Sequence, residues 1–204
     1  MISVDVLLYD GIEELDLCGP YEVLASCRKV VNGRWSDKPA FRVETVAERH
    51  TTVRCANGLS VLPNKPLAKA LDADILIVPG GPGARKEHVP VQTLEFIQRS
   101  AQTCEVLCAV CTGTFLLGSA GLLDGRRVTT HHAKLEELSK LYPKAIVIHG
   151  QRVVVDSKDG NLITSSGISA GIDLALALIS RFEGKETATL AAKRIEWPLA
   201  PVAV

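Results

Sequence analysis

Three short segments of the chain are apolar at nearly every position, and they constrain the fold more than any other feature. They are residues 2–9, 74–79 and 105–110. A strand that is apolar on both faces belongs inside a sheet that helices cover on both sides. Helical patterns at residues 89–103 and 169–182 provide the crossover connections that a parallel sheet requires. The pattern therefore predicts an α/β protein with three layers, α/β/α, around a mostly parallel central sheet.

No repeat, low-complexity tract or linker divides the sequence, so we expect a single domain over residues 1–204. A helix is expected over residues 19–30, because Pro20 suits a first helical turn. Asn57-Gly58 is expected to form a turn between two short strands. The further predicted strands are at 41–47, 51–62, 145–149, 152–155 and 162–164, and the further helices at 112–120 and 185–195.

Charge and hydropathy exclude several classes of protein. Lys and Arg together number 23, as do Asp and Glu, so the chain has no net charge. A general nucleic-acid binder carries a basic surplus, so we expect no nucleic acid as partner. Charged residues interrupt every apolar stretch before the roughly 20 residues that a membrane helix needs. The start, MISVDVLLYDG, lacks the marks of a signal peptide. We therefore expect a cytoplasmic protein that makes no membrane contact.

Cys111 lies where the predicted strand at 105–110 gives way to the predicted helix at 112–120. A sharp strand-to-helix turn presents its central residue above the edge of the sheet. The helix N-terminus directs unpaired N–H groups toward the sulfur, so we expect the pKa of Cys111 to be lowered. Gly113 allows the turn to be tight. A small buried hydrophobic residue is the alternative interpretation, but the junction favours a nucleophile.

Cys108 and Cys111 form a CxxC motif, which could be a redox pair. Cys108 falls inside the predicted strand, however, so its side chain should point into the packing. No second CxxC occurs in the sequence, which excludes a zinc ribbon. The six cysteines are expected to be mostly free thiols in a reducing compartment.

A glycine-rich loop, Gly80-Gly81-Pro82-Gly83, follows the apolar run at 74–79. Backbone N–H groups in such a loop can bind an anion or a developing negative charge, so Gly80 and Gly81 are candidate donors. The loop lacks the GK[ST] of a phosphate-binding loop and the third glycine of a dinucleotide-binding motif. An ordinary tight turn is the alternative.

Asp16 lies between Leu15 and Leu17, shortly after the first predicted strand. A carboxyl among apolar neighbours has its pKa raised by desolvation. If Cys111 lies close to it, the two groups are expected to titrate as a coupled pair that shares a proton. A helix cap or a surface acid are the alternatives for Asp16.

Two threonines and two histidines form the run Thr129-Thr130-His131-His132. Adjacent histidines on a strand point to opposite faces, and the other histidines of the chain show no matching ligand spacing. We therefore predict no metal site. One histidine of the pair is expected to face the loop that carries Cys111.

Together these segments resemble the DJ-1/PfpI superfamily, a branch of the class I glutamine-amidotransferase-like proteins. The resemblance spans nearly the whole chain, and it implies a flavodoxin-like sandwich and a homodimer. Within the superfamily, the motifs LDxxGPYE, CTG and TTHH are similar to those of the isonitrile hydratase branch. The segments that carry the resemblance are VLLYDGIEELDLCGPYEVL, DILIVPGGPG, VLCAVCTGTFLLGSAGLLDGRRVTTHH and ITSSGISAGIDLALALI.

Two departures separate the chain from other branches. Thr112 follows Cys111 at the position where many PfpI-type members carry histidine, which argues against a Cys-His hydrolase. Family members fused to helix-turn-helix regulators continue well beyond this length. Only WPLAPVAV follows Glu196 here, so we expect no attached DNA-binding domain.

The resemblance implies a lyase that hydrates a small isonitrile, R–NC, to the formamide R–NH–CHO without a cofactor or metal. We expect Asp16 to protonate the isonitrile carbon and the Cys111 thiolate to attack it, giving a thioimidate that water then hydrolyses. Thr112 and Gly81 are expected to stabilise the developing charge, with Gly80 beside them. His131 occupies a position where many members carry a histidine near the nucleophile.

Two alternatives remain for the same sulfur. One is a glyoxalase or deglycase that acts on small aldehydes through Cys111. The other is a non-catalytic ligand-binding or redox-sensing module in which Cys111 is oxidised.

Overall fold

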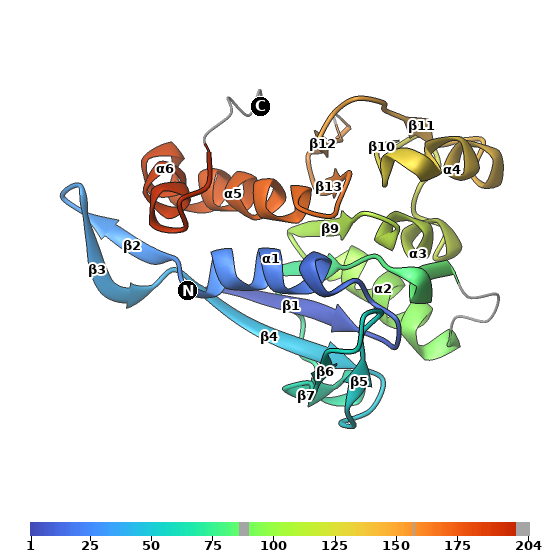
Figure 1. Ribbon diagram of the computed structural model, residues 1–204, viewed down its shortest axis with the longest axis horizontal. Coiled ribbons are helices and arrows are strands. Elements are labelled where there is room, and N and C mark those ends of the chain that lie inside the picture. Colours follow the sequence, from blue (N-terminus) through green and yellow to red (C-terminus); the bar gives the residue numbers. More distant parts are fainter. Residues whose placement is uncertain (86–89, 157, 199–204) are drawn as a thin grey trace.

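The structure is a computed structural model that describes residues 1–85, 90–156 and 158–198. Its centre is a seven-stranded sheet in the order β12-β13-β9-β8-β1-β4-β7, with helices on both faces (Figure 1). Every neighbouring pair is parallel except β12 with β13. This confirms the predicted α/β fold with a mostly parallel sheet. The strands are β1 (Ile2–Leu8), β4 (Phe41–Ala47), β7 (Lys65–Pro66), β8 (Ile75–Val78), β9 (Val106–Val110), β12 (Val153–Val155) and β13 (Leu162–Ser165).

Each face of the sheet has its own apolar core. Val4 and Val6 of β1 pack with the helices on one face, and Leu7 packs with those on the other. Because side chains alternate along a strand, a strand covered on both sides must be apolar at both sets of positions. One face carries α1 (Glu14–Ala25), α5 (Ala170–Glu183) and α6 (Lys185–Arg194), and the other α2 (Val91–Thr103), α3 (Gly113–Ser119) and α4 (Leu135–Leu141).

The first helix differs from its prediction. It begins at Glu14 rather than at residue 19, and it ends at Ala25. Pro20 lies inside the helix, where its ring approaches Gly171 of α5 closely enough that an added Cβ there would lie 3.2 Å away. The proline therefore marks a close helix–helix contact. The earlier start places Asp16 in the first turn of the helix.

Residues 26–30 were expected to continue that helix, but the chain instead forms a hairpin of β2 (Arg28–Val31) and β3 (Arg34–Pro39). Asn32 and Gly33 both have positive φ, 53° and 72°. Such a pair forms the two-residue turn that matches the twist of a hairpin. The Asn-Gly signal outweighs the apolar pattern that favoured a helix.

The remaining short elements lie outside the seven-stranded sheet. The predicted turn at Asn57-Gly58 is confirmed, since β5 (Val53–Arg54) and β6 (Ser60–Val61) pair antiparallel around it. The strand β10 (Arg127–Val128) pairs with β11 (Ile146–Val147), and 3-10 turns occupy Leu67–Lys69, Pro82–Arg85 and His132–Lys134. Residue 89, predicted to start a helix, and the tail 199–204 lie outside the described residues.

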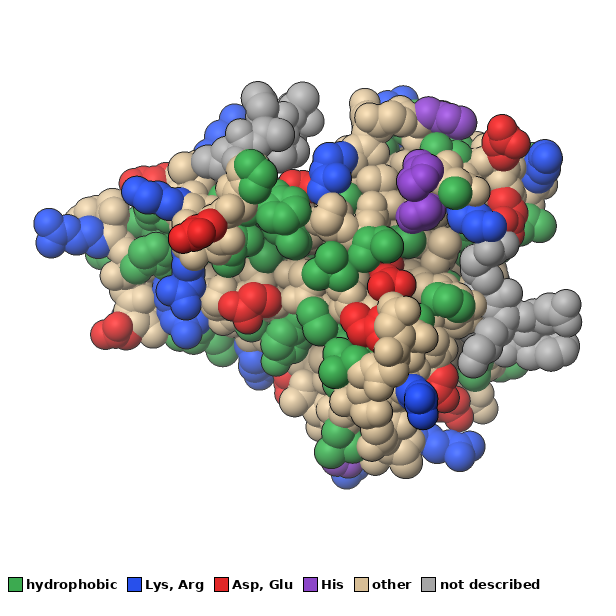
Figure 2. All heavy atoms as spheres, viewed as in Figure 1, with side chains coloured by type: hydrophobic (Ala, Val, Ile, Leu, Met, Phe, Trp, Pro, Cys, Tyr) green, Lys and Arg blue, Asp and Glu red, His purple; other side chains and the backbone are tan. Residues whose placement is uncertain are grey.

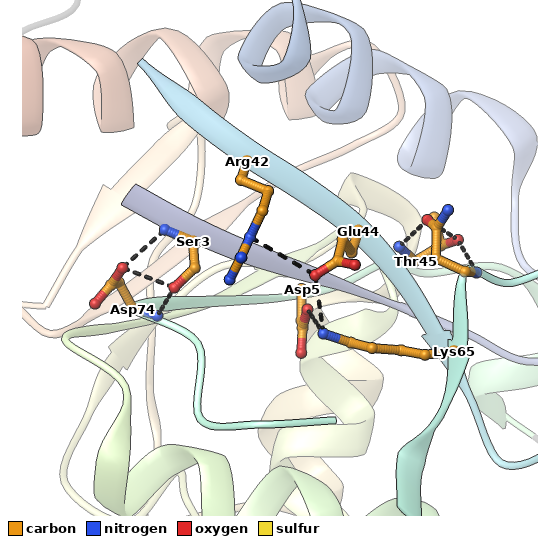
Figure 3. Close-up of polar contacts among 8 residues, drawn as sticks. Ser3, Asp5, Arg42, Glu44, Thr45, Lys65 and Asp74 are labelled. Carbon is orange, nitrogen blue, oxygen red and sulfur yellow. Dashed lines mark hydrogen bonds and ion pairs between the residues drawn. The ribbon is translucent and has the colours of Figure 1, made fainter. Parts of the chain in front are cut away.

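Ion pairs connect β7, at one edge of the sheet, to β4 and β1 (Figure 3). Lys65 of β7 lies 3.1 Å from both Asp5 of β1 and Glu44 of β4. Asp5 is 3% exposed, so burial raises its pKa, and Lys65 lowers it by a smaller amount. The ion pair with Lys65 offsets part of the cost of burying this carboxylate.

Candidate active site

Cys111 forms the turn between β9 and α3. Its φ of 56° lies in the left-handed region, which costs a residue with a Cβ free energy. The Cys111 N–H donates to the Ser165 carbonyl at 2.9 Å, which ties the turn to β13. The first residue of α3, Gly113, must be a glycine, because an added Cβ would lie 2.2 Å from the Val78 carbonyl oxygen of β8. Neighbouring strands thus hold the sulfur-bearing residue in a strained conformation.

A second loop closes over the sulfur. Gly167 follows β13, and a Cβ added there would lie 2.3 Å from Cys111 Cβ and 2.9 Å from Sγ. The backbone of this loop therefore packs directly against the cysteine. Cys111 is 6% exposed, so only a small part of its surface is accessible to a reactant.

Asp16 approaches from α1 and is completely buried. Its Oδ2 accepts a hydrogen bond from the Gly80 N–H at 3.1 Å. Its Oδ1 has no hydrogen-bond partner among the residues that the structure describes. The alternative of a surface acid is thereby excluded, and one buried carboxyl oxygen is left available.

Burial governs the protonation of both groups. It raises the pKa of Asp16 to about 7, and the Cys111 thiol and the Gly80 N–H lower that pKa by less. It also raises the pKa of Cys111 to about 12, and the negative charge of Asp16 adds to this rise. The expectation that the helix N-terminus lowers the pKa of Cys111 is therefore wrong, because desolvation outweighs the Thr112 N–H. At neutral pH the resting pair is a protonated thiol beside a partly ionised carboxyl.

Thr112 and Gly81 bind each other. The Gly81 N–H donates to Thr112 Oγ1 at 2.8 Å, and the Thr112 hydroxyl donates to the Gly81 carbonyl at 3.1 Å. The Gly80 N–H is likewise engaged, with Asp16. The glycine loop therefore orients the site in the resting protein. For the N–H groups of Gly80 or Gly81 to bind substrate, these bonds would have to break.

Tyr9 is a site residue that the sequence analysis missed. Its hydroxyl donates to the Pro79 carbonyl. Burial raises its pKa well above the ordinary value, and the charges of Asp16 and Cys111 raise it further. The phenol therefore stays protonated and fixes the loop that presents Gly80 to Asp16. Only the fold brings Tyr9 to Pro79, so no local pattern could have indicated this role.

The two histidines do not lie on a strand, contrary to the prediction. The strand β10 ends at Val128, so His131 and His132 do not alternate along a strand, and their ring centroids lie 4.3 Å apart. His131 Nδ1 accepts from the Ala133 N–H at 3.3 Å. Partial burial and the neighbouring His132 and Lys134 lower the pKa of His131, which favours the neutral ring.

The described residues contain no group of three or more His, Cys, Asp or Glu side chains that could hold a metal ion. Cys108 is buried in β9, and burial raises its pKa well above the usual value. All six cysteines are free thiols. Among the described helices, none is long and apolar enough to cross a membrane.

The sequence and the fold of the chain are similar to those of known proteins. The chain is 38% identical to an isonitrile hydratase from Pseudomonas putida, over 98% of this chain and 80% of that protein. It is 32% identical to the transcriptional regulator GbdR of Pseudomonas aeruginosa, over 90% of this chain but only 47% of the regulator. The crystal structure of a mutant DJ-1 superfamily protein from Salmonella typhimurium matches with a TM-score of 0.78 and 26% identity, over 98% of this chain and all of that one. The DJ-1/PfpI family description matches residues 2–181, and the chain belongs to this family.

Proposed function

We propose that the protein is an isonitrile hydratase that uses Cys111 as a covalent nucleophile and Asp16 as a proton shuttle. The observation that carries the proposal is the unpartnered, fully buried Asp16 Oδ1 in a carboxyl that interacts with the Cys111 thiol. The similarity to the Pseudomonas putida isonitrile hydratase supports it.

An isonitrile makes an unusual demand on a catalyst. Its terminal carbon must accept a proton and a nucleophile at the same atom. The Asp16–Cys111 pair offers both from adjacent positions. Because the resting thiol is protonated and Asp16 is partly ionised near pH 7, Asp16 takes the thiol proton and delivers it to the carbon as sulfur attacks. The product of this step is the thioimidate R–N=CH–S–Cys111, and Asp16 is again a carboxylate.

Water completes the reaction. Asp16 removes a proton from water as its oxygen attacks the thioimidate carbon, and the proton passes to the nitrogen. The tetrahedral intermediate R–NH–CH(OH)–S–Cys111 then breaks its C–S bond. The hydroxyl proton returns to the sulfur by way of Asp16, which yields the formamide and restores the thiol. One isonitrile and one water are consumed, and no redox change occurs.

The remaining residues have supporting parts in this proposal. Thr112 and Gly81 orient the strand-to-helix turn at Cys111, which we call the elbow, and the Gly80 N–H stabilises the ionised form of Asp16. The Thr112 N–H lowers the pKa of Cys111 and is the donor best placed to stabilise charge on the sulfur as it leaves. His131 is proposed to contact the substrate as a neutral ring.

The experiment is a substrate panel with matched variants. Purified protein is mixed with alkyl and aryl isonitriles, and formamide is followed by proton NMR. Wild type and the exposed-thiol control Cys18→Ser should form formamide, whereas Cys111→Ala, Cys111→Ser and Asp16→Asn should not. Turnover retained by Cys111→Ala would exclude the covalent route. Lactate from methylglyoxal without any formamide would instead identify a glyoxalase.

We also propose that the protein acts as a cytoplasmic homodimer. Hydrophobic side chains gather on the face that α1 and α5 present (Figure 2), and Leu15, Ile168 and Leu59 are 40%, 37% and 44% exposed. Such residues at the surface suit a protein–protein contact. Light scattering coupled to size-exclusion chromatography should give the mass of a dimer. A monomer at micromolar concentration would contradict this part of the proposal.

A further inference from the structure

The two threonines of the run Thr129-Thr130-His131-His132 have no part in the chemistry described above, although Thr130 lies beside Cys111 in the folded chain. Thr130 is completely buried, and its hydroxyl donates to the Cys111 carbonyl at 2.8 Å. The contact joins the nucleophile to a segment 19 residues further along the chain.

A second hydroxyl lies near the same carbonyl but has a better acceptor. Thr114 Oγ1 is 2.9 Å from the Thr129 carbonyl and 3.3 Å from the Cys111 carbonyl. A hydroxyl has a single hydrogen to donate, so Thr114 serves mainly Thr129. Thr130 is then the principal side-chain donor to the Cys111 carbonyl.

The Thr129–Thr130 segment is itself held firmly. The Thr129 N–H donates to Thr164 Oγ1 of β13 at 2.9 Å, and its carbonyl accepts from Thr114 of α3. Thr129 is 1% exposed. The segment is therefore braced from both sides of the elbow, so the Thr130 hydroxyl has a fixed position.

The strained backbone of Cys111 needs such support. A residue with a Cβ at a φ of 56° persists only where its surroundings hold it. The Cys111 N–H is held by Ser165 and its carbonyl by Thr130. Rotation about the φ and ψ bonds of Cys111 would carry Sγ away from Asp16.

We propose that Thr130 is a positioning residue that keeps the Cys111 sulfur in line with Asp16, and that the threonines of the TTHH run serve the nucleophile. This inference rests on the proposed function, because it assigns Thr130 a role in the same reaction. Thr130 acts through the backbone of Cys111 and does not touch the reacting atoms.

The test compares Thr130→Val, which keeps the shape but removes the hydroxyl, with Thr130→Ser, which keeps the hydroxyl. The matched control is Thr187→Val, because Thr187 of α6 is 3% exposed and its hydroxyl donates to the Glu183 carbonyl at the end of α5 at 2.8 Å. Thr130→Val should lower kcat for isonitrile hydration about threefold to tenfold, the effect of one neutral hydrogen bond, with KM nearly unchanged. Thr130→Ser should recover most of kcat, and Thr187→Val should lower the Tm without lowering kcat.

A second readout does not depend on the isonitrile reaction. The rate of alkylation of Cys111 by iodoacetamide, followed by peptide mass spectrometry, should show an inflection near pH 7 in wild type that Asp16→Asn removes. Thr130→Val should weaken this inflection, and Thr130→Ser should keep it. If no isonitrile is hydrated but the inflection responds in this way, the proposed function fails and the positioning role stands. A wild-type kcat and a wild-type inflection in Thr130→Val would overturn the inference.

Discussion

Asp16→Asn should stabilise the protein while it removes the proton shuttle. Burial raises the pKa of this carboxyl from 3.8 to about 7, so the folded state holds the proton more tightly than the unfolded chain does. The stability that the proton contributes is complete below the unfolded pKa and is lost as the pH rises through the folded pKa. At 1.36 kcal/mol per pKa unit, burial of this carboxyl costs the folded state about 4 kcal/mol above pH 7, where Asp16 ionises, but only about 2 kcal/mol at pH 5, where folded Asp16 keeps its proton.

Asparagine carries no charge at either pH, and its amide oxygen can still accept from the Gly80 N–H. The stability difference between Asp16→Asn and wild type should therefore grow by about 2 kcal/mol from pH 5 to pH 8. Urea unfolding at the two pH values measures it. Glu22→Gln controls for the loss of one carboxylate, because Glu22 lies on the exposed face of the same helix.

The reasoning fails if the difference is the same at pH 5 and pH 8. That result would mean that Asp16 titrates alike in the folded and unfolded states. It would also remove the basis for a carboxyl that exchanges its proton near neutral pH.

Three further substitutions test the surroundings of the pair. Gly80→Ala brings a methyl group within 2.8 Å of Asp16 Oδ2, and formamide production should fall at least about tenfold while the fold persists by circular dichroism. Tyr9→Phe frees the loop that carries the Gly80 N–H, which should raise the pKa of Asp16 and move the acidic limb of the pH–rate profile to higher pH; an unmoved limb would contradict this. Lys65→Met leaves Asp5 buried without its partner, so urea unfolding should show a loss of about 3 kcal/mol that is larger at pH 8 than at pH 5.

The sheet could be predicted because its central strands are apolar on both faces. β1, β8 and β9 each lie within one residue or two of the predicted runs. The hairpin of residues 28–39 was missed because Asn32-Gly33 follows a stretch whose apolar residues also fit a helix. Local pattern cannot decide between the two when a turn and a helical face overlap.

Two residues of the candidate site, Cys111 and Asp16, could be predicted from their positions in the sequence. Cys111 stands at a strand-to-helix junction, and Asp16 stands among apolar neighbours, so both could be identified along the chain. The raised pKa of Cys111 could not, because it depends on how deeply the fold buries the sulfur. Tyr9 and Thr130 act on carbonyl groups 70 and 19 residues away, and only the assembled sheet brings those partners together.

The left-handed backbone at Cys111 also limits which nucleophiles this site could ever use. A residue with a branched Cβ is strongly disfavoured at this φ, so threonine does not suit the position, whereas serine has the same unbranched shape as cysteine. Sulfur and oxygen can therefore be exchanged here by a single substitution that leaves the scaffold intact. The reactivity of this site can therefore change through one atom while the architecture stays the same.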